Sequence, residues 1–227
     1  MLEKNKLQIL LEAALQTGAD FAEIFLEDTA SSVIRVMNGE VTSIDRGNVF
    51  GAGVRLIQNT DEVYGFTNEV SYDAILNLVQ NLRASFSGPL HKAVPLGEAK
   101  PYVDNIKRPM ESVPVSEKTA KLQKLSNIIK SHDPRIVQAI AQLIETRQKV
   151  WVANSEGVYQ DDLRTYTRVV MMAASSENGL MQQASEGPGR YMGFEIFDAL
   201  DLETLAKEVA VSSITLLSAE DMVPQVM

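Results

Sequence analysis

The sequence of 227 residues contains no cysteine and only two histidines. Without cysteine, these residues can form no disulfide, no thiolate metal site and no thiol nucleophile. The two histidines, His91 and His132, lie in separate segments, whereas a two-histidine zinc site on a helix needs both rings about one turn apart. We therefore predict that this chain holds no metal site.

Basic residues are also in deficit, with 21 lysines and arginines against 30 aspartates and glutamates and a net charge of −9. Such a balance argues against direct binding of nucleic acid phosphates. The apolar runs are too short to cross a bilayer, and no leader resembling a signal peptide is present. Together with the missing cysteines, this predicts a soluble cytoplasmic protein with no membrane association.

Residues 1–85 have the pattern of an α+β domain. Helical periodicity from Leu7 to Leu15 ends at Gly18, and Ser71 is suited to cap a second helix that extends to Leu82. Asn38-Gly39 is a strong hairpin signal because both residues tolerate positive φ. The strands expected between the two helices are Phe21 to Glu27, Ser32 to Met37, Val41 to Asp45, Val49 to Ile57 and Val63 to Thr67.

The remaining chain divides into a linker and a second α+β domain. Residues 86–114 hold five of the eight prolines, which excludes a regular helix and predicts an extended linker. In residues 115–227, Ser116 is expected to cap a helix, and Asp201 or a neighbouring residue is expected to start a closing helix that reaches Leu217. Alternation between Ile136 and Phe197 predicts four or five antiparallel strands. The expected fold class is α+β, with two parts that are each a mainly antiparallel sheet packed with helices.

Few side chains suggest chemistry. Asp161 and Asp162 are adjacent in a predicted strand, so they point to opposite faces and are poorly placed to share a proton or a metal. There is no Gly-x-Ser-x-Gly elbow to support a nucleophilic serine. We therefore predict no catalytic residue in this chain.

The richest glycine cluster runs from Ser185 to Gly193. It lacks the Lys-Ser/Thr ending of a phosphate-binding loop and the strand and helix of a dinucleotide site. Its glycines permit a bend between strands. They also leave accessible backbone where another chain can lie, and on this second interpretation Gly187, Gly189 and Arg190 are the candidate substrate-binding residues.

Several segments, in this order, resemble the TldD/PmbA metallopeptidase family, whose members are often named modulators of DNA gyrase. The N-terminal domain of that family is similar to the segments 18–25 (GADFAEIF), 38–39 (NG), 51–55 (GAGVR) and 64–68 (YGFTN) and to the helix opened by Ser71. The sheet and closing helix of the second half are similar to the family's middle domain. Residues 64–68 look more like the TldD branch than the PmbA branch.

The resemblance implies proteolysis of short or unfolded peptides at a zinc site in a C-terminal domain. There, a His-Glu pair, a second histidine and a later cysteine supply the ligands and the general base. None of these residues is present, and the sequence ends at Met227, about where that domain would begin. The resemblance thus implies a non-catalytic portion of a TldD-like peptidase, without cofactor in this chain, that shapes the substrate channel and contacts another TldD/PmbA-type subunit in a homo- or hetero-oligomer. The alternatives are a PmbA-type partner subunit without metal and a freestanding peptide-binding module.

Overall fold

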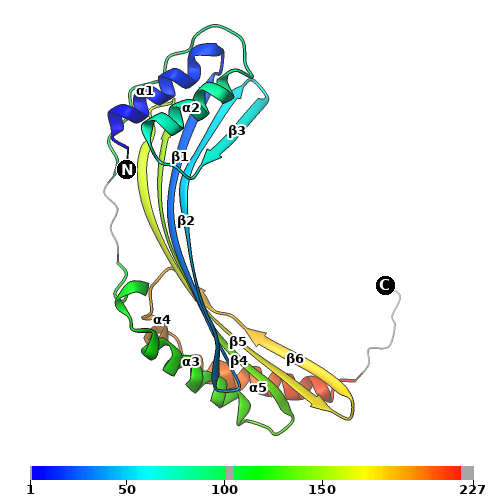
Figure 1. The fold of residues 1–227 in the computed structure, drawn as a ribbon. Coiled ribbons are helices and arrows are strands. Elements are labelled where there is room, and N and C mark those ends of the chain that lie inside the picture. The colour runs from blue at the N-terminus through cyan, green and yellow to red at the C-terminus, as the bar shows by residue number, and fades with distance from the viewer. Residues whose placement is uncertain (1, 101–104, 221–227) are drawn as a thin grey trace. The chain divides into compact units, whose positions relative to one another are not determined.

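Long antiparallel strands carry the fold of the computed structural model, which describes residues 2–100 and 105–220 (Figure 1). The chain forms two compact units, each assembled from three separate segments. Unit 1 comprises Met1–Ala30, Asn48–Asp104 and Gln148–Arg164, and unit 2 comprises Ser31–Gly47, Asn105–Arg147 and Thr165–Met227. These units do not coincide with the predicted domains 1–85 and 115–227, because four strands each contribute residues to both units.

The secondary structure elements follow one another in an α+β pattern, which confirms the predicted fold class. Hydrogen-bonded strands are arranged in the order β3-β2-β1-β4-β5-β6, and β7 also pairs with β5. In chain order, the elements are α1 (Lys4–Ala14), η1 (Leu15–Thr17), β1 (Phe21–Met37), β2 (Glu40–Gln58), β3 (Asp61–Thr67), α2 (Tyr72–Arg83), η2 (Met110–Ser112), α3 (Val115–Lys130), β4 (Ile136–Asn154), β5 (Tyr159–Glu177), β6 (Leu180–Glu186), β7 (Gly189–Arg190), α4 (Ile196–Ala199) and α5 (Leu202–Leu217).

The helices of unit 1 begin and end where the sequence predicts. The Ser71 hydroxyl accepts a hydrogen bond of 3.2 Å from the Ala74 N–H and so caps α2. Gly18, at φ +104°, ends the helical turn η1 that follows α1. Both helices lie on one face of the strands of this unit (Figure 1). Their apolar faces pack against one core, which includes Leu7, Leu10, Leu11, Leu15, Ile75 and Val79.

Strand alternation divides the side chains of unit 1 between two faces. On β1, Ala22, Ile24 and Leu26 are buried in the helix-covered core, so the residues between them point to the opposite face. We call this opposite side the open face of the unit. On β3, the register places Phe66 beside Gly53 and Tyr64 beside Arg55 of β2. The open face of unit 1 therefore carries aromatic side chains on β1 and β3. At the glycines of β2 it carries no side chain.

Two pairs of predicted strands are in fact single strands. The segments 21–27 and 32–37 belong to β1, and the segments 41–45 and 49–57 belong to β2. The predicted breaks fall on residues 28–31 and 46–48, which are polar or small. Backbone pairing continues through them, because ladder hydrogen bonds depend on the main chain rather than on side-chain polarity.

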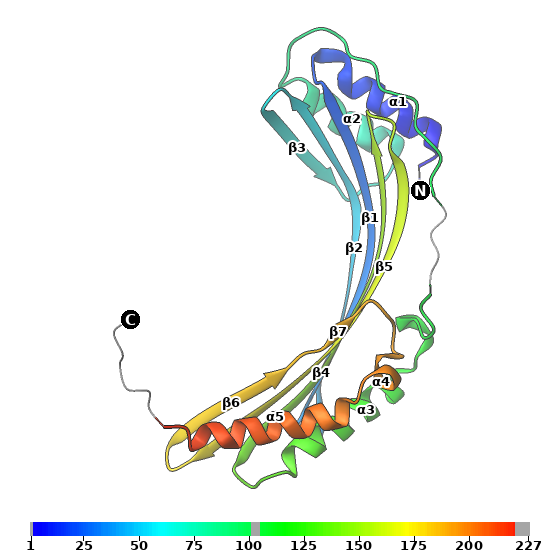
Figure 2. The same ribbon diagram turned by 180° about the vertical axis from the view of Figure 1, so that it is seen from behind.

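Unit 2 is held at its turns by side-chain hydrogen bonds. Asn38 and Gly39 take positive φ angles of 50° and 81° and form the predicted hairpin turn. The Gly39 N–H donates to the Ser126 hydroxyl, and this hydroxyl in turn donates to the Ala139 carbonyl, each at 3.0 Å. These bonds tie helix α3 to the β1–β2 turn and to strand β4. Figure 2 shows α3 and α5 against the strands of this unit.

The predicted cap of α3 at Ser116 is wrong, whereas the predicted start of α5 at or beside Asp201 is confirmed. Helix α3 starts two residues earlier, with Pro114 as its N-cap, and the Pro114 carbonyl accepts hydrogen bonds from the N–H groups of Glu117 and Lys118. The fixed φ of proline is compatible with this position, and no side chain caps the helix start. At α5, the Asp201 carboxylate accepts a 3.0 Å hydrogen bond from the Thr204 N–H.

A buried ion pair joins α3 to β4 in unit 2. Lys118 Nζ lies 2.6 Å from Glu145 Oε2, and the two side chains are only 4% and 2% exposed. Lys118 also donates to the Met110 carbonyl at 2.8 Å, which fixes the turn before the helix. Burial raises the pKa of Glu145, and the hydrogen bond from Lys118 opposes this shift. Each partner is therefore needed to compensate the buried charge of the other.

We predict that Lys118→Met lowers the free energy of unfolding by about 3–5 kcal/mol, because it leaves the Glu145 carboxylate buried without a cation. The double variant Lys118→Met/Glu145→Leu should recover most of this loss, since it removes both charges. Urea denaturation at neutral pH measures the two effects. The deficit of the single variant should shrink as pH falls from the raised pKa of the buried Glu145 to the ordinary glutamate pKa of about 4.3, because the buried carboxyl group takes up a proton before the unfolded one does. A loss below about 1 kcal/mol for Lys118→Met would contradict the role of this pair.

Candidate functional site

The glycine cluster predicted as a substrate-binding element forms the short strand β7 and the bend before it. Gly189 and Arg190 pair with Arg168 and Thr167 of β5, and the Pro188 carbonyl accepts a 3.0 Å hydrogen bond from the Val169 N–H. Both residues of β7 are exposed. Gly187 lies in the bend between β6 and β7. The segment thus provides both features that the sequence suggested, a bend and accessible backbone.

Gly189 and Arg190 line a hollow of about 380 Å³ on the surface of unit 2. Tyr166 and Arg168 reach it from β5, where they alternate with the buried Thr165, Thr167 and Val169. The Tyr166 and Tyr191 rings meet edge to face, with their centroids 5.3 Å apart and their planes at 87°. Both rings remain half exposed. The hollow therefore presents an aromatic wall beside an accessible backbone strand.

Two guanidinium groups border the same hollow. Arg168 Nε donates to the Gly187 carbonyl at 2.9 Å, and Arg190 Nη1 donates to the Gly189 carbonyl at 2.8 Å. A Cβ atom on Gly187 would lie 2.7 Å from Arg168 Nη2, so the missing side chain allows this guanidinium to lie against the backbone. The hollow is a locally basic site on a chain of net charge −9. Guanidinium and tyrosine groups in this arrangement can bind carbonyl, carboxylate and apolar groups of a ligand.

The last glycine of the cluster has a structural role instead. A Cβ atom on Gly193 would lie 2.2 Å from the Arg108 carbonyl oxygen, which accepts a 2.8 Å hydrogen bond from the neighbouring Phe194 N–H. At Gly189, by contrast, the nearest atom would be 3.5 Å away, an ordinary contact. The cluster thus combines a glycine required by close packing with one that leaves open space at the hollow.

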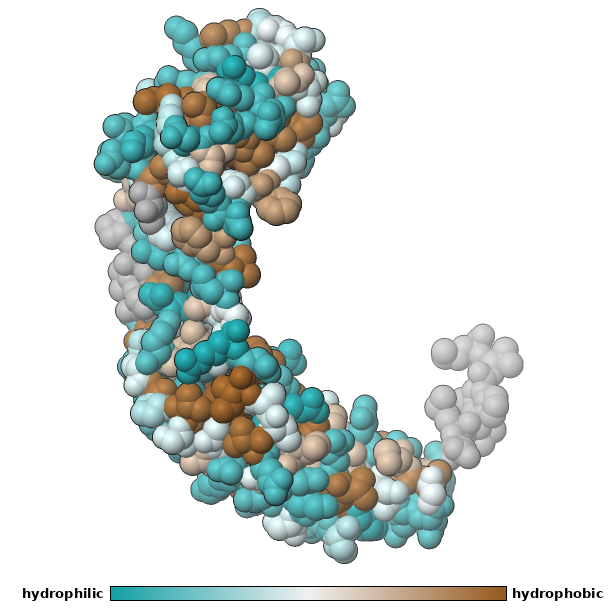
Figure 3. Space-filling view, viewed as in Figure 1, coloured by the Kyte–Doolittle hydropathy of each residue, from teal (hydrophilic) through white to brown (hydrophobic). Residues whose placement is uncertain are grey.

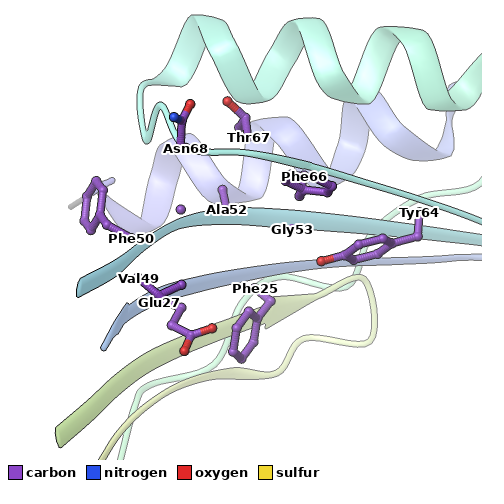
Figure 4. A pocket seen from close by; sticks show the side chains of 11 residues that line it. Phe25, Glu27, Val49, Phe50, Ala52, Gly53, Tyr64, Phe66, Thr67 and Asn68 are labelled. Atoms are coloured by element: carbon purple, nitrogen blue, oxygen red, sulfur yellow. The ribbon is translucent and has the colours of Figure 1, made fainter. Parts of the chain in front are cut away.

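A second hollow, of about 330 Å³, lies on the open face of unit 1 (Figure 4). Phe25 and Glu27 of β1, Gly51 and Gly53 of β2, and Tyr64 and Phe66 of β3 contribute to its lining. The Tyr64 ring lies over β2 with its hydroxyl near Gly53. In the sequence these glycines stand within the expected strand Val49 to Ile57 and carry no sign of a hollow. Phe25 and Glu27 alternate with buried residues along β1, and this alternation in the sequence indicates that both side chains point to the same face.

The other candidates from the sequence are not brought together. His91 belongs to unit 1 and His132 to unit 2. Asp162 accepts a 2.8 Å hydrogen bond from Arg164 Nε, as a surface carboxylate does. Within residues 2–100 and 105–220, no three histidine, cysteine, aspartate or glutamate side chains gather as a metal site would require. None of the described helices is both long and apolar enough to span a bilayer.

Apolar surface is distributed over both units on the side shown in Figure 3, set among polar residues. Scattered apolar exposure of this kind is normal for a folded chain. The two hollows differ from it because each combines aromatic rings with a charged group and side-chain-free backbone.

Two family models match the chain. Residues 22–86 match the PmbA/TldA metallopeptidase domain 1, and residues 108–217 match the PmbA/TldA metallopeptidase central domain. Together they cover most of the sequence. The gap between them, residues 87–107, lies within the predicted linker 86–114.

Individual relatives carry related names. The chain is 24% identical over 194 residues to a "Metalloprotease TldD homolog" of Buchnera aphidicola subsp. Schizaphis graminum, which covers 84% of this chain and 40% of that protein. It is also 24% identical over 209 residues to a "Metalloprotease" of Methanothermobacter thermautotrophicus, covering 90% and 45%. The chain therefore spans less than half the length of these relatives.

A solved structure shares the fold. It is that of a protein from Bacteroides thetaiotaomicron described as a candidate modulator of DNA gyrase. The two superpose with a TM-score of 0.72 at 13% identity, and the match covers 93% of this chain and 49% of the other. At this identity the likeness concerns the fold alone.

Substitution of the two glycines by alanine should separate packing from the accessible hollow. We predict that Gly193→Ala lowers the free energy of unfolding by about 1–3 kcal/mol, because its Cβ forces the Arg108 backbone away. Gly189→Ala should stay within about 0.5 kcal/mol of the parent chain, since its Cβ meets only ordinary contacts. Urea denaturation of both variants measures the difference. Equal losses at the two positions would show that Gly193 is not held by this close approach.

Proposed function

Because this chain belongs to the PmbA/TldD metallopeptidase family, we propose that it is a non-catalytic portion of a TldD-like peptidase that acts on short or unfolded peptides. In this proposal the chain guides the substrate and contacts another subunit, and the remaining length seen in the relatives carries the hydrolytic chemistry. The TldD name of the Buchnera relative supports the TldD branch.

The observation that carries the proposal is the hollow of unit 2. It brings the predicted residues Gly189 and Arg190 together with Tyr166, Arg168 and Tyr191. Among the described strands, β7 pairs only with β5. An extended peptide could therefore form main-chain hydrogen bonds with the other edge of β7. Pairing through main-chain hydrogen bonds tolerates any substrate sequence, and the tyrosine rings add apolar contact that is equally unselective.

The donor set of this chain does not fit the zinc ion that the family name implies. Zinc is held by histidine, cysteine and carboxylate ligands gathered around one ion. Here cysteine is absent, and the two histidines lie in different units. Zinc therefore belongs to our proposal only for the full-length protein, and no step is assigned to it in this chain.

The proposed setting is a cytoplasmic homo- or hetero-oligomer of TldD/PmbA-type subunits. The complete absence of cysteine suits a reducing compartment. The net charge of −9 disfavours direct contact with DNA, so we place any link to gyrase in the turnover of peptides or protein regulators. A PmbA-type subunit without metal, or a freestanding peptide-binding module, would use the same hollow. The two are distinguished from the peptidase by the metal content of the full-length protein.

We predict that Gly189→Val, which fills the hollow, weakens binding of an unstructured peptide to this chain about tenfold, a loss of about 1.4 kcal/mol. Gly187→Val should act in the same direction, because its side chain displaces the Arg168 guanidinium. Isothermal titration calorimetry measures the affinity, and in the full-length enzyme the same variants should raise KM and leave kcat unchanged.

Gln183→Val is the matched control, because Gln183 is exposed on β6 and lies outside the hollow. It introduces the same side chain on an accessible strand and should bind peptide like the parent chain. Unchanged affinity and KM in both glycine variants would refute the role of this hollow in substrate binding. A full-length protein that binds peptide but neither holds zinc nor cleaves would instead favour the partner subunit.

A further inference from the structure

A repeated pair of residues stands on the open face of unit 1. Along β1, Phe21, Glu23, Phe25 and Glu27 occupy alternate positions, between the buried residues of the helix-covered face. Successive side chains of one face lie about 7 Å apart along a strand. The strand therefore presents two Phe–Glu pairs of the same orientation, one after the other.

The first pair is completed by an arginine of the same chain. Arg55 of β2 places Nη2 3.1 Å from Glu23 Oε1. Its Cζ atom lies 5.8 Å from the centroid of the Phe21 ring, within cation–π distance. The Arg55 guanidinium thus contacts both the carboxylate and the aromatic ring of this pair. A Phe–Glu pair in this arrangement can therefore accommodate an arginine side chain.

The second pair has no such partner from β2. Gly53 and Gly51, two and four residues before Arg55, carry no side chain, and the hollow of about 330 Å³ lies beside Phe25 and Glu27 instead. A Cβ atom on Gly53 would lie 2.5 Å from the Tyr64 hydroxyl, and one on Gly51 would lie 2.7 Å from the Thr67 carbonyl oxygen. At these two positions β2 therefore contributes no side chain beside Phe25 and Glu27, and the nearest β2 side chain of the hollow is that of Val49.

The carboxylate at this hollow is held in place. Glu27 Oε1 accepts hydrogen bonds from Thr29 Oγ1 at 2.5 Å and from Gln148 Nε2 at 2.9 Å. Tyr64 and Phe66 stand opposite, 59% and 79% exposed, although large aromatic side chains usually bury most of their surface. Figure 4 shows Phe25 and Glu27 next to each other at the hollow. An oriented anion among exposed rings is a receptor for a cation with flat, apolar faces.

We propose that this hollow binds the arginine side chain of an extended peptide or protein segment, with its guanidinium against Glu27 and over the ring of Phe25 or Tyr64. Arginine fits better than lysine, because its planar guanidinium can stack on a ring while it donates a hydrogen bond to the carboxylate oxygen Oε2, and Oε1 already accepts two hydrogen bonds. It fits better than an uncharged apolar side chain, which would leave Glu27 uncompensated. The net charge of −9 favours a cationic ligand as well. The inference does not rest on the proposed peptidase role, because it concerns a different hollow in a different unit.

The test is an NMR titration of this chain with three capped pentapeptides that differ only at their central residue. That residue is arginine, citrulline or norleucine, and glycine stands on either side. We expect the arginine peptide to bind about three- to thirtyfold more tightly than the citrulline peptide, which has the same shape and no charge. The amide signals of Gly51 and Gly53 should shift on binding, and affinity should fall as salt is added.

Glu27→Gln should abolish the preference for arginine over citrulline. Glu62→Gln is the matched control, because Glu62 is an exposed carboxylate of β3 outside the hollow and its loss changes the net charge equally. If Glu27→Gln does not fold by circular dichroism, the comparison of the three peptides on the parent chain still decides. Equal affinity for arginine and citrulline, tighter binding of norleucine, or shifts that avoid Gly51 and Gly53 would each overturn the proposal.

Discussion

Helices cover one face of the strands in each unit, and strand alternation then decides which side chains stay available on the other. In unit 1, burial of Ala22, Ile24 and Leu26 against α1 and α2 forces Phe25 and Glu27 onto the open face. In unit 2, the buried residues of β5 alternate with Tyr166 and Arg168, which therefore point to the surface. A shift of either strand by one residue would exchange core and surface throughout, so the cores hold both candidate sites in place.

Glycine residues contribute to the position of both hollows, on the open face of unit 1 and on the surface of unit 2. At Gly53 and Gly51 the space that a side chain would fill is bounded by Tyr64 and by the backbone of β3, so neither position can supply a ligand-like group of its own. At Gly187 the missing side chain instead allows a guanidinium to approach the backbone. Glycine in a strand weakens the strand itself. Its repeated presence beside aromatic and charged residues is therefore better explained by the space that it leaves than by local stability.

Sequence reasoning succeeded where a local rule acts alone. The cap at Ser71 and the hairpin at Asn38-Gly39 each depend on a few neighbouring residues, and so were predictable. It failed at the long strands, because residues 28–31 lack strand-like periodicity and are held by pairing with distant segments. It also missed the start of α3, where Pro114 rather than Ser116 is the N-cap. The lining of the unit 2 hollow was predictable only in part, since Gly189 and Tyr191 lie in the glycine cluster but Tyr166 reaches the hollow from β5.

The two hollows offer opposite charges to a ligand. In unit 2, Arg168 and Arg190 border the tyrosine wall, whereas in unit 1 Glu27 stands among the rings. A peptide main chain carries carbonyl oxygens at every residue, so a basic hollow can accept any sequence. An acidic aromatic hollow selects for a cationic side chain. Under our two proposals, the hollow of unit 2 would supply affinity without selection and the hollow of unit 1 would supply selection. Only some residues of an unfolded chain could complete the Phe25–Glu27 pair, as Arg55 completes the Phe21–Glu23 pair of the same strand.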